Sequence, residues 1–75
     1  MTRNDFIHLV NSREQREFVV DGVVYALTYD KDSSGKEYVV FGRTFQGERY
    51  EDAGELLNAV KIGNRYLKNM LEEFD

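Results

Sequence analysis

Two runs of β-branched and aromatic residues constrain the fold of this chain more than any other feature. They cover Val23–Tyr29 and Tyr38–Phe41. Residues of these types suit a pleated, half-buried surface, so both runs are predicted to be β-strands. Just before the first run, Asp21-Gly22 lies between β-branched residues. This pair predicts a tight hairpin, because a type I′ turn needs positive φ at both central positions.

Further turn residues divide this part of the chain into an antiparallel meander. Gln46-Gly47 can turn the chain once more, in which case Glu48–Tyr50 is a very short fourth strand. The three strands expected before it lie at about residues 16–20, at 23–30, and from Lys36 to Arg43 or Phe45.

A short helix is predicted at the N-terminus. Thr2 and Asp5 have the form of a capping box, with a hydroxyl at the N-cap and a carboxylate three residues later, although Asn4 can serve as the cap instead. An apolar stripe from Phe6 to Val10 follows and ends before Asn11. A helix this short is expected to be stable only when it docks on another part of the chain.

A longer amphipathic helix is predicted at the C-terminus, opening with a second capping box formed by Asp52 and Glu55. The apolar residues after it recur at spacings of four and three, as on one side of a helix. Gly63-Asn64 interrupts this pattern, so a kink or break is expected near residues 62–64. The stripe consists of Leu56, Val60, Gly63, Leu67, Met70 and Phe74.

These elements predict a single α+β domain over residues 1–75, with two layers: the meander, and the two helices on one of its faces. Neither central strand alternates cleanly between apolar and polar residues, so the pattern leaves open which face is buried. The uncovered face is expected to expose apolar or aromatic side chains, which usually mark an interaction surface. The aromatic candidates for that surface are Tyr25, Tyr29 and Tyr38.

The composition argues against several chemistries. The chain has no cysteine, and its single histidine, His8, lies in a predicted helix with no nucleophile and orienting group beside it. Asp30–Gly35 matches the opening of a calcium loop, but the twelfth position is Phe41 instead of a glutamate, and turn chemistry explains the match. We therefore expect no enzyme activity, no cofactor and no metal. No apolar run suits a membrane span or signal peptide, so a cytoplasmic location is expected.

The charge is mildly acidic, with a formal net charge of -4. The excess lies in Asp21–Glu55, where eight acids face four bases. This balance argues against direct nucleic-acid binding, which would need a basic face. It leaves an acidic surface as a second candidate for protein contact, represented by Asp30, Asp32 and Glu37.

Several motifs, taken in order, resemble a loose class of small uncharacterised bacterial or phage-type proteins of α-β-β-β-α plan. They are Asp5-Phe6-Ile7, Phe18, Asp21–Tyr25, Gly35–Tyr38, Tyr50 and Glu55-Leu56-Leu57. The acidity and the opening Asn4–Ile7 are also similar to small type II anti-CRISPR inhibitors, which mimic DNA. A double-stranded-RNA-binding domain shares the order of elements, but it carries a basic cluster at the start of its last helix, where this chain has Glu51–Glu55.

Together the composition, the uncovered face of the sheet and these resemblances predict a non-catalytic protein-interaction module, either a homodimer or an adaptor to another protein. The alternative is an acidic inhibitor of a nucleic-acid enzyme, similar to a DNA mimic or an anti-CRISPR protein, that presents the Asp21–Glu55 surface.

Overall fold

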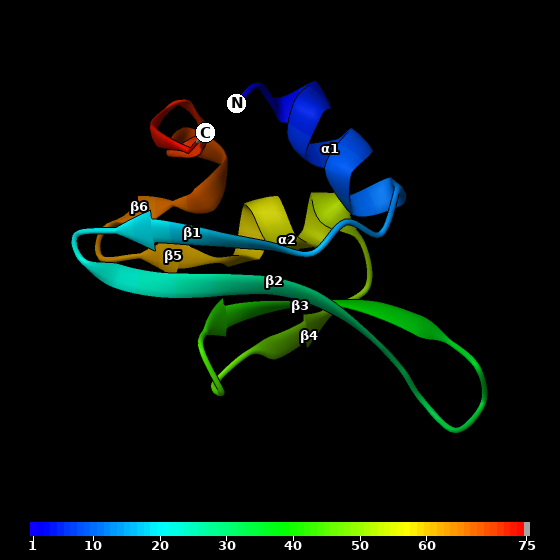
Figure 1. Cartoon of the computed structure of the whole chain (residues 1–75). Coiled ribbons are helices and arrows are strands. Elements are labelled where there is room, and N and C mark those ends of the chain that lie inside the picture. The colour runs from blue at the N-terminus through cyan, green and yellow to red at the C-terminus, as the bar shows by residue number, and fades with distance from the viewer. Residues whose placement is uncertain (75) are drawn as a thin grey trace.

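The computed structural model describes residues 1–74 as an α+β fold built on a four-stranded antiparallel sheet in the order β1-β2-β3-β4 (Figure 1). The predicted α+β class, N-terminal helix, antiparallel meander and short fourth strand are confirmed. In chain order the elements are α1 (Arg3–Asn11), β1 (Arg16–Val20), β2 (Val23–Lys31), β3 (Glu37–Arg43), β4 (Glu48–Tyr50), α2 (Ala53–Ala59), β5 (Lys61–Ile62), β6 (Arg65–Tyr66) and the 3-10 helices η1 (Leu67–Asn69) and η2 (Leu71–Glu73).

The hairpin between β1 and β2 turns where the sequence predicts it. Asp21 has a φ of 51° and Gly22 a φ of 79°, as a type I′ turn requires. Val20 and Val23 are register partners on either side of the turn. Local turn chemistry therefore sets the register of the first two strands.

Side-chain caps begin both α-helices. At α1 the box is reciprocal: the Thr2 hydroxyl accepts from the Asp5 amide at 3.1 Å, and the Asp5 carboxylate accepts from the Thr2 amide at 3.1 Å. At α2 the Asp52 carboxylate accepts from the Glu55 amide at 2.8 Å. These bonds satisfy amides that have no partner within the helix.

The C-terminal third differs from the long amphipathic helix expected there. The helix α2 ends at Ala59, ahead of the 62–64 segment. Residues 61–66 form the β5–β6 hairpin, which turns at Gly63 with a φ of 66°. The apolar spacing of three also suits a 3-10 turn, where side chains at i and i+3 lie on the same side. The apolar residues beyond the hairpin are buried in this way, namely Leu67, Met70, Leu71 and Phe74.

The core lies between one face of the sheet and the elements α1, α2, η1 and η2, which Figure 1 shows on the same side of β1 and β2. In β2 only Leu27 is fully buried, and its register partner Phe41 is 2% exposed. Register partners share a face, so this pair identifies the covered one. The full set of buried residues is Phe6, Leu9, Val10, Phe18, Val20, Leu27, Val39, Phe41, Ala53, Leu56, Leu57, Leu67, Met70, Leu71 and Phe74.

The opposite side of the sheet, here called the open face, follows from the same alternation. It consists of Glu17, Val19, Val24, Ala26, Thr28, Asp30, Tyr38, Val40, Gly42 and Arg49. Within residues 1–74 no helix has the length and apolar character needed to cross a membrane.

Candidate interaction surface

Apolar side chains gather along the open face. Val19 is 66% exposed and pairs across β1 and β2 with Val24, which is 37% exposed. Ala26, Thr28 and Val40 continue the face toward β3 and are partly buried. Most of these side chains are small or β-branched, so this part of the open face is flat and has few polar groups.

The loop between β3 and β4 adds a large aromatic group to this face. Phe45 is fully exposed, and its backbone has a φ of 68°. A bulky residue rarely adopts this left-handed conformation, which costs free energy that the rest of the loop must offset. The Gln46 amide donates to the Arg43 carbonyl at 2.8 Å and closes the turn beneath Phe45.

Two glycines let this loop pack directly against β3. A Cβ atom on Gly42 would lie 2.8 Å from the Gln46 carbonyl oxygen and 2.9 Å from the Gly47 Cα. A Cβ atom on Gly47 would lie 2.6 Å from a methyl group of Val40. Neither position has room for a side chain, so the two glycines allow the loop that carries Phe45 to lie close to β3.

A shallow hollow lies beside Phe45 on the open face. Its volume is about 280 Å³, and most of the residues that line it are small or β-branched. Phe45 itself forms part of the wall. The residues that line the hollow are Ala26, Thr28, Val40, Gly42, Arg43, Thr44, Phe45 and Gly47.

One unpaired charge lies on the open face beside its apolar part. Glu17 is exposed on β1 and is the register partner of Ala26. Arg43 is also exposed, but it is the register partner of Tyr25 and therefore belongs to the covered side of the sheet. Within residues 1–74 neither side chain makes a hydrogen bond or an ion pair. The open face therefore carries one negative group, Glu17, that is free to meet a charge on another molecule.

The structure separates the three tyrosines proposed from the sequence. Tyr25 and Tyr29 lie on the covered face and pack against the core. The Tyr25 ring stacks on Phe41 with centroids 5.9 Å apart, and the Tyr29 hydroxyl donates to the Glu14 carbonyl at 2.7 Å. Burial raises the pKa of the Tyr29 hydroxyl. Only Tyr38 belongs to the open face.

Tyr38 lies in a cluster with two of the proposed acids. The Arg49 guanidinium lies 5.2 Å from the Tyr38 ring centroid and donates to Asp30 at 2.8 Å, which lowers the pKa of the Asp30 carboxyl. The Tyr38 hydroxyl donates to Asp32 at 3.2 Å. Asp30 is therefore not available as an unopposed negative charge.

Asp32 caps its own turn. Its carboxylate accepts from the Ser34 hydroxyl at 2.6 Å, from the Ser34 amide at 2.8 Å and from the Lys36 amide at 3.0 Å. The bond from the Ser34 side chain is the largest cause that lowers the pKa of Asp32 to about 2. These bonds explain the calcium-loop-like composition by turn chemistry, and within residues 1–74 no group of three or more acids or histidines is placed to hold a metal ion.

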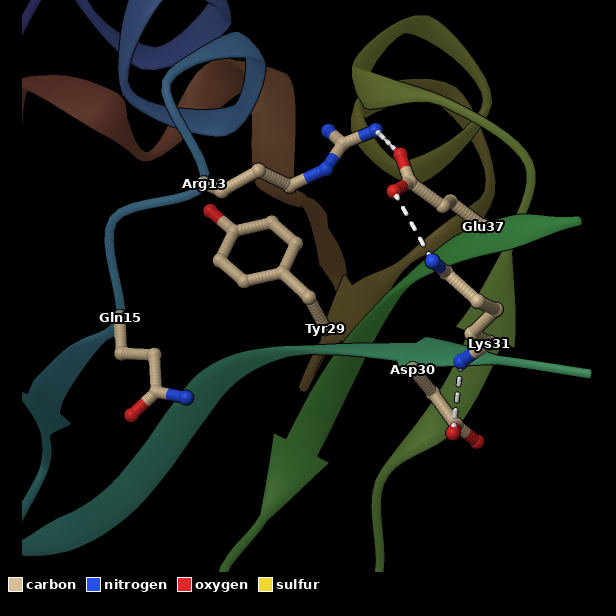
Figure 2. A pocket seen from close by; sticks show the side chains of 6 residues that line it. All are labelled: Arg13, Gln15, Tyr29, Asp30, Lys31 and Glu37. Atoms are coloured by element: carbon tan, nitrogen blue, oxygen red, sulfur yellow. Dashed lines mark hydrogen bonds and ion pairs between the residues drawn. The ribbon is translucent and has the colours of Figure 1, made fainter. Parts of the chain in front are cut away.

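Glu37 belongs to a different cluster, on the side of the sheet toward Tyr29. An open hollow of about 440 Å³ lies here. Figure 2 shows the side chains that line it, from Arg13, Gln15, Tyr29, Asp30, Lys31 and Glu37. Arg13 donates to Glu37 at 2.6 Å and lies 5.5 Å from the Tyr29 ring centroid. The Arg13 hydrogen bond lowers the pKa of Glu37. The charges of this hollow largely satisfy one another, so it offers little to a charged ligand.

The sequence reasoning missed Phe45 as a surface residue, because it placed this residue at the end of the third strand or in the turn after it. The available signal was a phenylalanine next to Gln46-Gly47, where a turn exposes whatever side chain it carries.

No protein-family model matches the chain, and no curated protein or solved structure is detectably similar to it.

Proposed function

We propose that this chain is a non-catalytic protein-interaction module and that its binding surface is the open face together with Phe45. The observation that carries the proposal is the fully exposed Phe45 ring, held in a left-handed loop above an apolar part of the sheet. An aromatic side chain in such a position is typical of an interface anchor.

The layering of the domain supports the same proposal. The helices and 3-10 turns pack their apolar side chains against one face of the sheet, so the domain can be described as two layers. Nothing in residues 1–74 covers Val19, Val24 or Phe45, which are among the most exposed large apolar side chains. A contiguous apolar patch is uncommon on a monomer unless another molecule covers it.

An acidic inhibitor of a nucleic-acid enzyme is the weaker proposal. A DNA mimic must present carboxylates with little opposing charge, as phosphates do. Asp30 is bound by Arg49, and Glu37 is bound by Arg13. The geometry therefore favours apolar recognition over mimicry of a phosphate backbone.

Site-specific photo-crosslinking in extracts of the source cell tests the proposed function. A benzophenone analogue of phenylalanine at position 45 is expected to form discrete protein adducts. The same group in place of His8, which is exposed on α1, provides the control and is expected to form none. Val19→Asp, on the same face as Phe45, should abolish the adducts. Identical adduct patterns at both positions, or none at position 45, would overturn the proposal.

A further inference from the structure

We infer that the outer edge of β1 binds an extended segment of another protein, which adds a strand to the sheet and places a basic side chain opposite Glu17. This inference goes beyond the proposed function, because it concerns the backbone at the edge of the sheet and does not involve Phe45. It is carried by Glu17 and Val19, whose outward backbone groups and side chains both lack partners within residues 1–74.

The backbone of β1 offers hydrogen-bonding groups along its free side. β1 is an outer strand, with β2 on one side only (Figure 1). The two-residue turn makes Val20 and Val23 a hydrogen-bonded pair, and such pairs recur at every second residue of an antiparallel ladder. Phe18 is the next of these residues in β1, so the N–H and C=O groups of Glu17 and Val19 point away from β2. Within residues 1–74 these outward groups have no hydrogen-bond partner.

The space beside this edge is open. Glu17 and Val19 line a hollow of about 240 Å³, together with Phe18, Glu73 and Phe74. The rings of Phe18 and Phe74 stack with centroids 4.6 Å apart, so the hollow lies against the edge of the core. In an added strand, the side chain opposite Phe18 points to the same side of the sheet and enters this hollow.

The side chains of the same two residues define what the added strand should carry. Val19 is 66% exposed, and Glu17 is exposed and has no ion-pair partner within residues 1–74. Side chains directly opposite one another on neighbouring strands interact, so the fitting strand has an apolar residue opposite Val19 and a lysine or arginine opposite Glu17. In strand addition the backbone bonds give affinity and such side-chain positions give specificity.

A second copy of the chain does not supply this pattern. Twofold antiparallel pairing of β1 with itself, centred at residue 17, 18 or 19, places Glu17 opposite Glu17, Val19 or Asp21 of the other copy, respectively. None of these residues is basic, and two of them would repel the Glu17 carboxylate. The edge therefore favours a different protein with a basic residue in its strand.

The opposite edge of the sheet offers less to a partner. β4 covers only Glu48–Tyr50, and the Arg49 side chain on it already donates to Asp30 at 2.8 Å. β1 extends over Arg16–Val20 and is therefore the edge at which a strand can be added.

NMR titration of the isotope-labelled full chain tests the strand addition. The probe is the capped synthetic peptide Thr-Thr-Val-Ile-Lys-Thr-Thr, whose valine and lysine lie opposite Val19 and Glu17 in an antiparallel pairing. The amide signals of Glu17 and Val19 are expected to move most. Those of Phe18 and Val20, which bond to β2, are expected to move less.

Two N-methylated peptides test the backbone bonds without changing the protein. A methyl group on the valine amide removes the donor that faces Val19, and it should raise the Kd about tenfold or more. A methyl group on the isoleucine amide, which points away from β1, is the matched control and should leave the Kd within a few-fold. Equal Kd values for the two methylated peptides would overturn the backbone pairing.

Variants of the chain test the same contacts from the other side. Val19→Pro removes an outward amide without breaking a bond to β2, so it should raise the Kd more than Val19→Ala, which removes only a side-chain contact. Glu17→Lys should weaken binding of the probe and strengthen binding of the same peptide with glutamate in place of lysine. Circular dichroism verifies that each variant is folded, and the methylated peptides decide the question if Val19→Pro is not.

The outcomes separate this inference from the proposed function. Phe45→Ser should leave the Kd for the peptide unchanged. A chain that binds no peptide at millimolar concentration overturns the inference, and adducts at position 45 would then still support the proposed function. Peptide binding without adducts at position 45 has the reverse meaning. Movement of the Glu17 and Val19 signals with protein concentration alone would identify a second copy as the occupant and overturn the inference.

Discussion

Single residues in this chain have roles that depend on a few close atoms. Asp32 organises the turn between β2 and β3 through its bonds to Ser34 and Lys36. Gly42 and Gly47 lack a side chain at the points where the loop between β3 and β4 lies closest to β3, so the loop can pack there. In both cases the residue shapes a connection, and the connection sets where neighbouring side chains lie.

The turn at Asp32 makes a prediction about pH. The folded pKa of about 2 lies below the usual value of about 3.9 for an unfolded chain, so its contribution to stability is present above about pH 4 and is lost as the pH falls toward 2. NMR titration should place the Asp32 midpoint near 2. Ser34→Ala removes the largest cause and should raise this midpoint. A midpoint near the usual value in wild type would contradict the assigned hydrogen bonds.

The loop glycines make a prediction about packing. Gly42→Ala should destabilise the domain by about 1–3 kcal/mol, because the new Cβ meets backbone atoms that have no room to move. Urea unfolding monitored by circular dichroism measures the change. Gly54→Ala is the matched control, since its Cβ would have an ordinary 3.4 Å contact with the carboxylate of the N-cap residue Asp52, and alanine favours a helix. Equal losses from both substitutions would show that the loop does not pack tightly on β3.

At the scale of elements, local signals decide where each element starts and turns. The Asp21-Gly22 turn fixes the register of β1 on β2, and the Thr2–Asp5 box starts α1. The elements after Ala59 follow a different rule. They are short, their backbone changes from hairpin to 3-10 turns, and their position depends on the buried residues Leu67 and Phe74.

The hairpin makes the prediction at this scale. Gly22→Val should lower the free energy of unfolding by more than about 1 kcal/mol, because a β-branched residue tolerates a φ of 79° badly. Gly22→Asn should cost less, since asparagine adopts the left-handed conformation more readily. The measurement is the urea midpoint at constant slope. An unchanged midpoint for Gly22→Val would rule out the positive-φ turn.

At the scale of the whole molecule, the two faces of one strand have different roles. Leu27 is fully buried beneath the helices, whereas Val24, three residues earlier, lies on the open face. A domain of 75 residues has little stability to spare, so the core side of β2 determines whether the chain folds. The side chains on the open face of β2 lie outside this core and are available for contacts with another molecule.

These different roles predict that replacing a side chain by alanine has unequal effects on the two faces of β2. Leu27→Ala should cost about 2–5 kcal/mol, enough to unfold a large fraction of the protein. Val24→Ala, measured on dilute protein, should change stability by less than about 1 kcal/mol, since the side chain is partly solvated already. Chemical denaturation of both variants provides the comparison. A larger loss for Val24→Ala would reverse the assignment of the faces.

Much of the fold and little of the candidate surface could be predicted from the residues alone. The hairpin, the two caps and all four strands of the main sheet follow from local chemistry. The spacing of Leu56 to Phe74 was misleading, because 3-10 turns bury residues at intervals of three much as a helix does. Phe45 was not recognised, and Tyr25 and Tyr29 were grouped with Tyr38 although they lie on the other side of the sheet.

The sequence by itself determined the turns, the caps and the order of strands, because each depends on residues within a few positions of one another. Only the tertiary structure decided which face of β2 is covered, since both faces carry apolar side chains and the choice depends on where α1 and α2 dock. The same docking decides that Phe45, Val19 and Val24 stay exposed on one surface. That outcome depends on contacts between segments far apart in the chain, which no local pattern records.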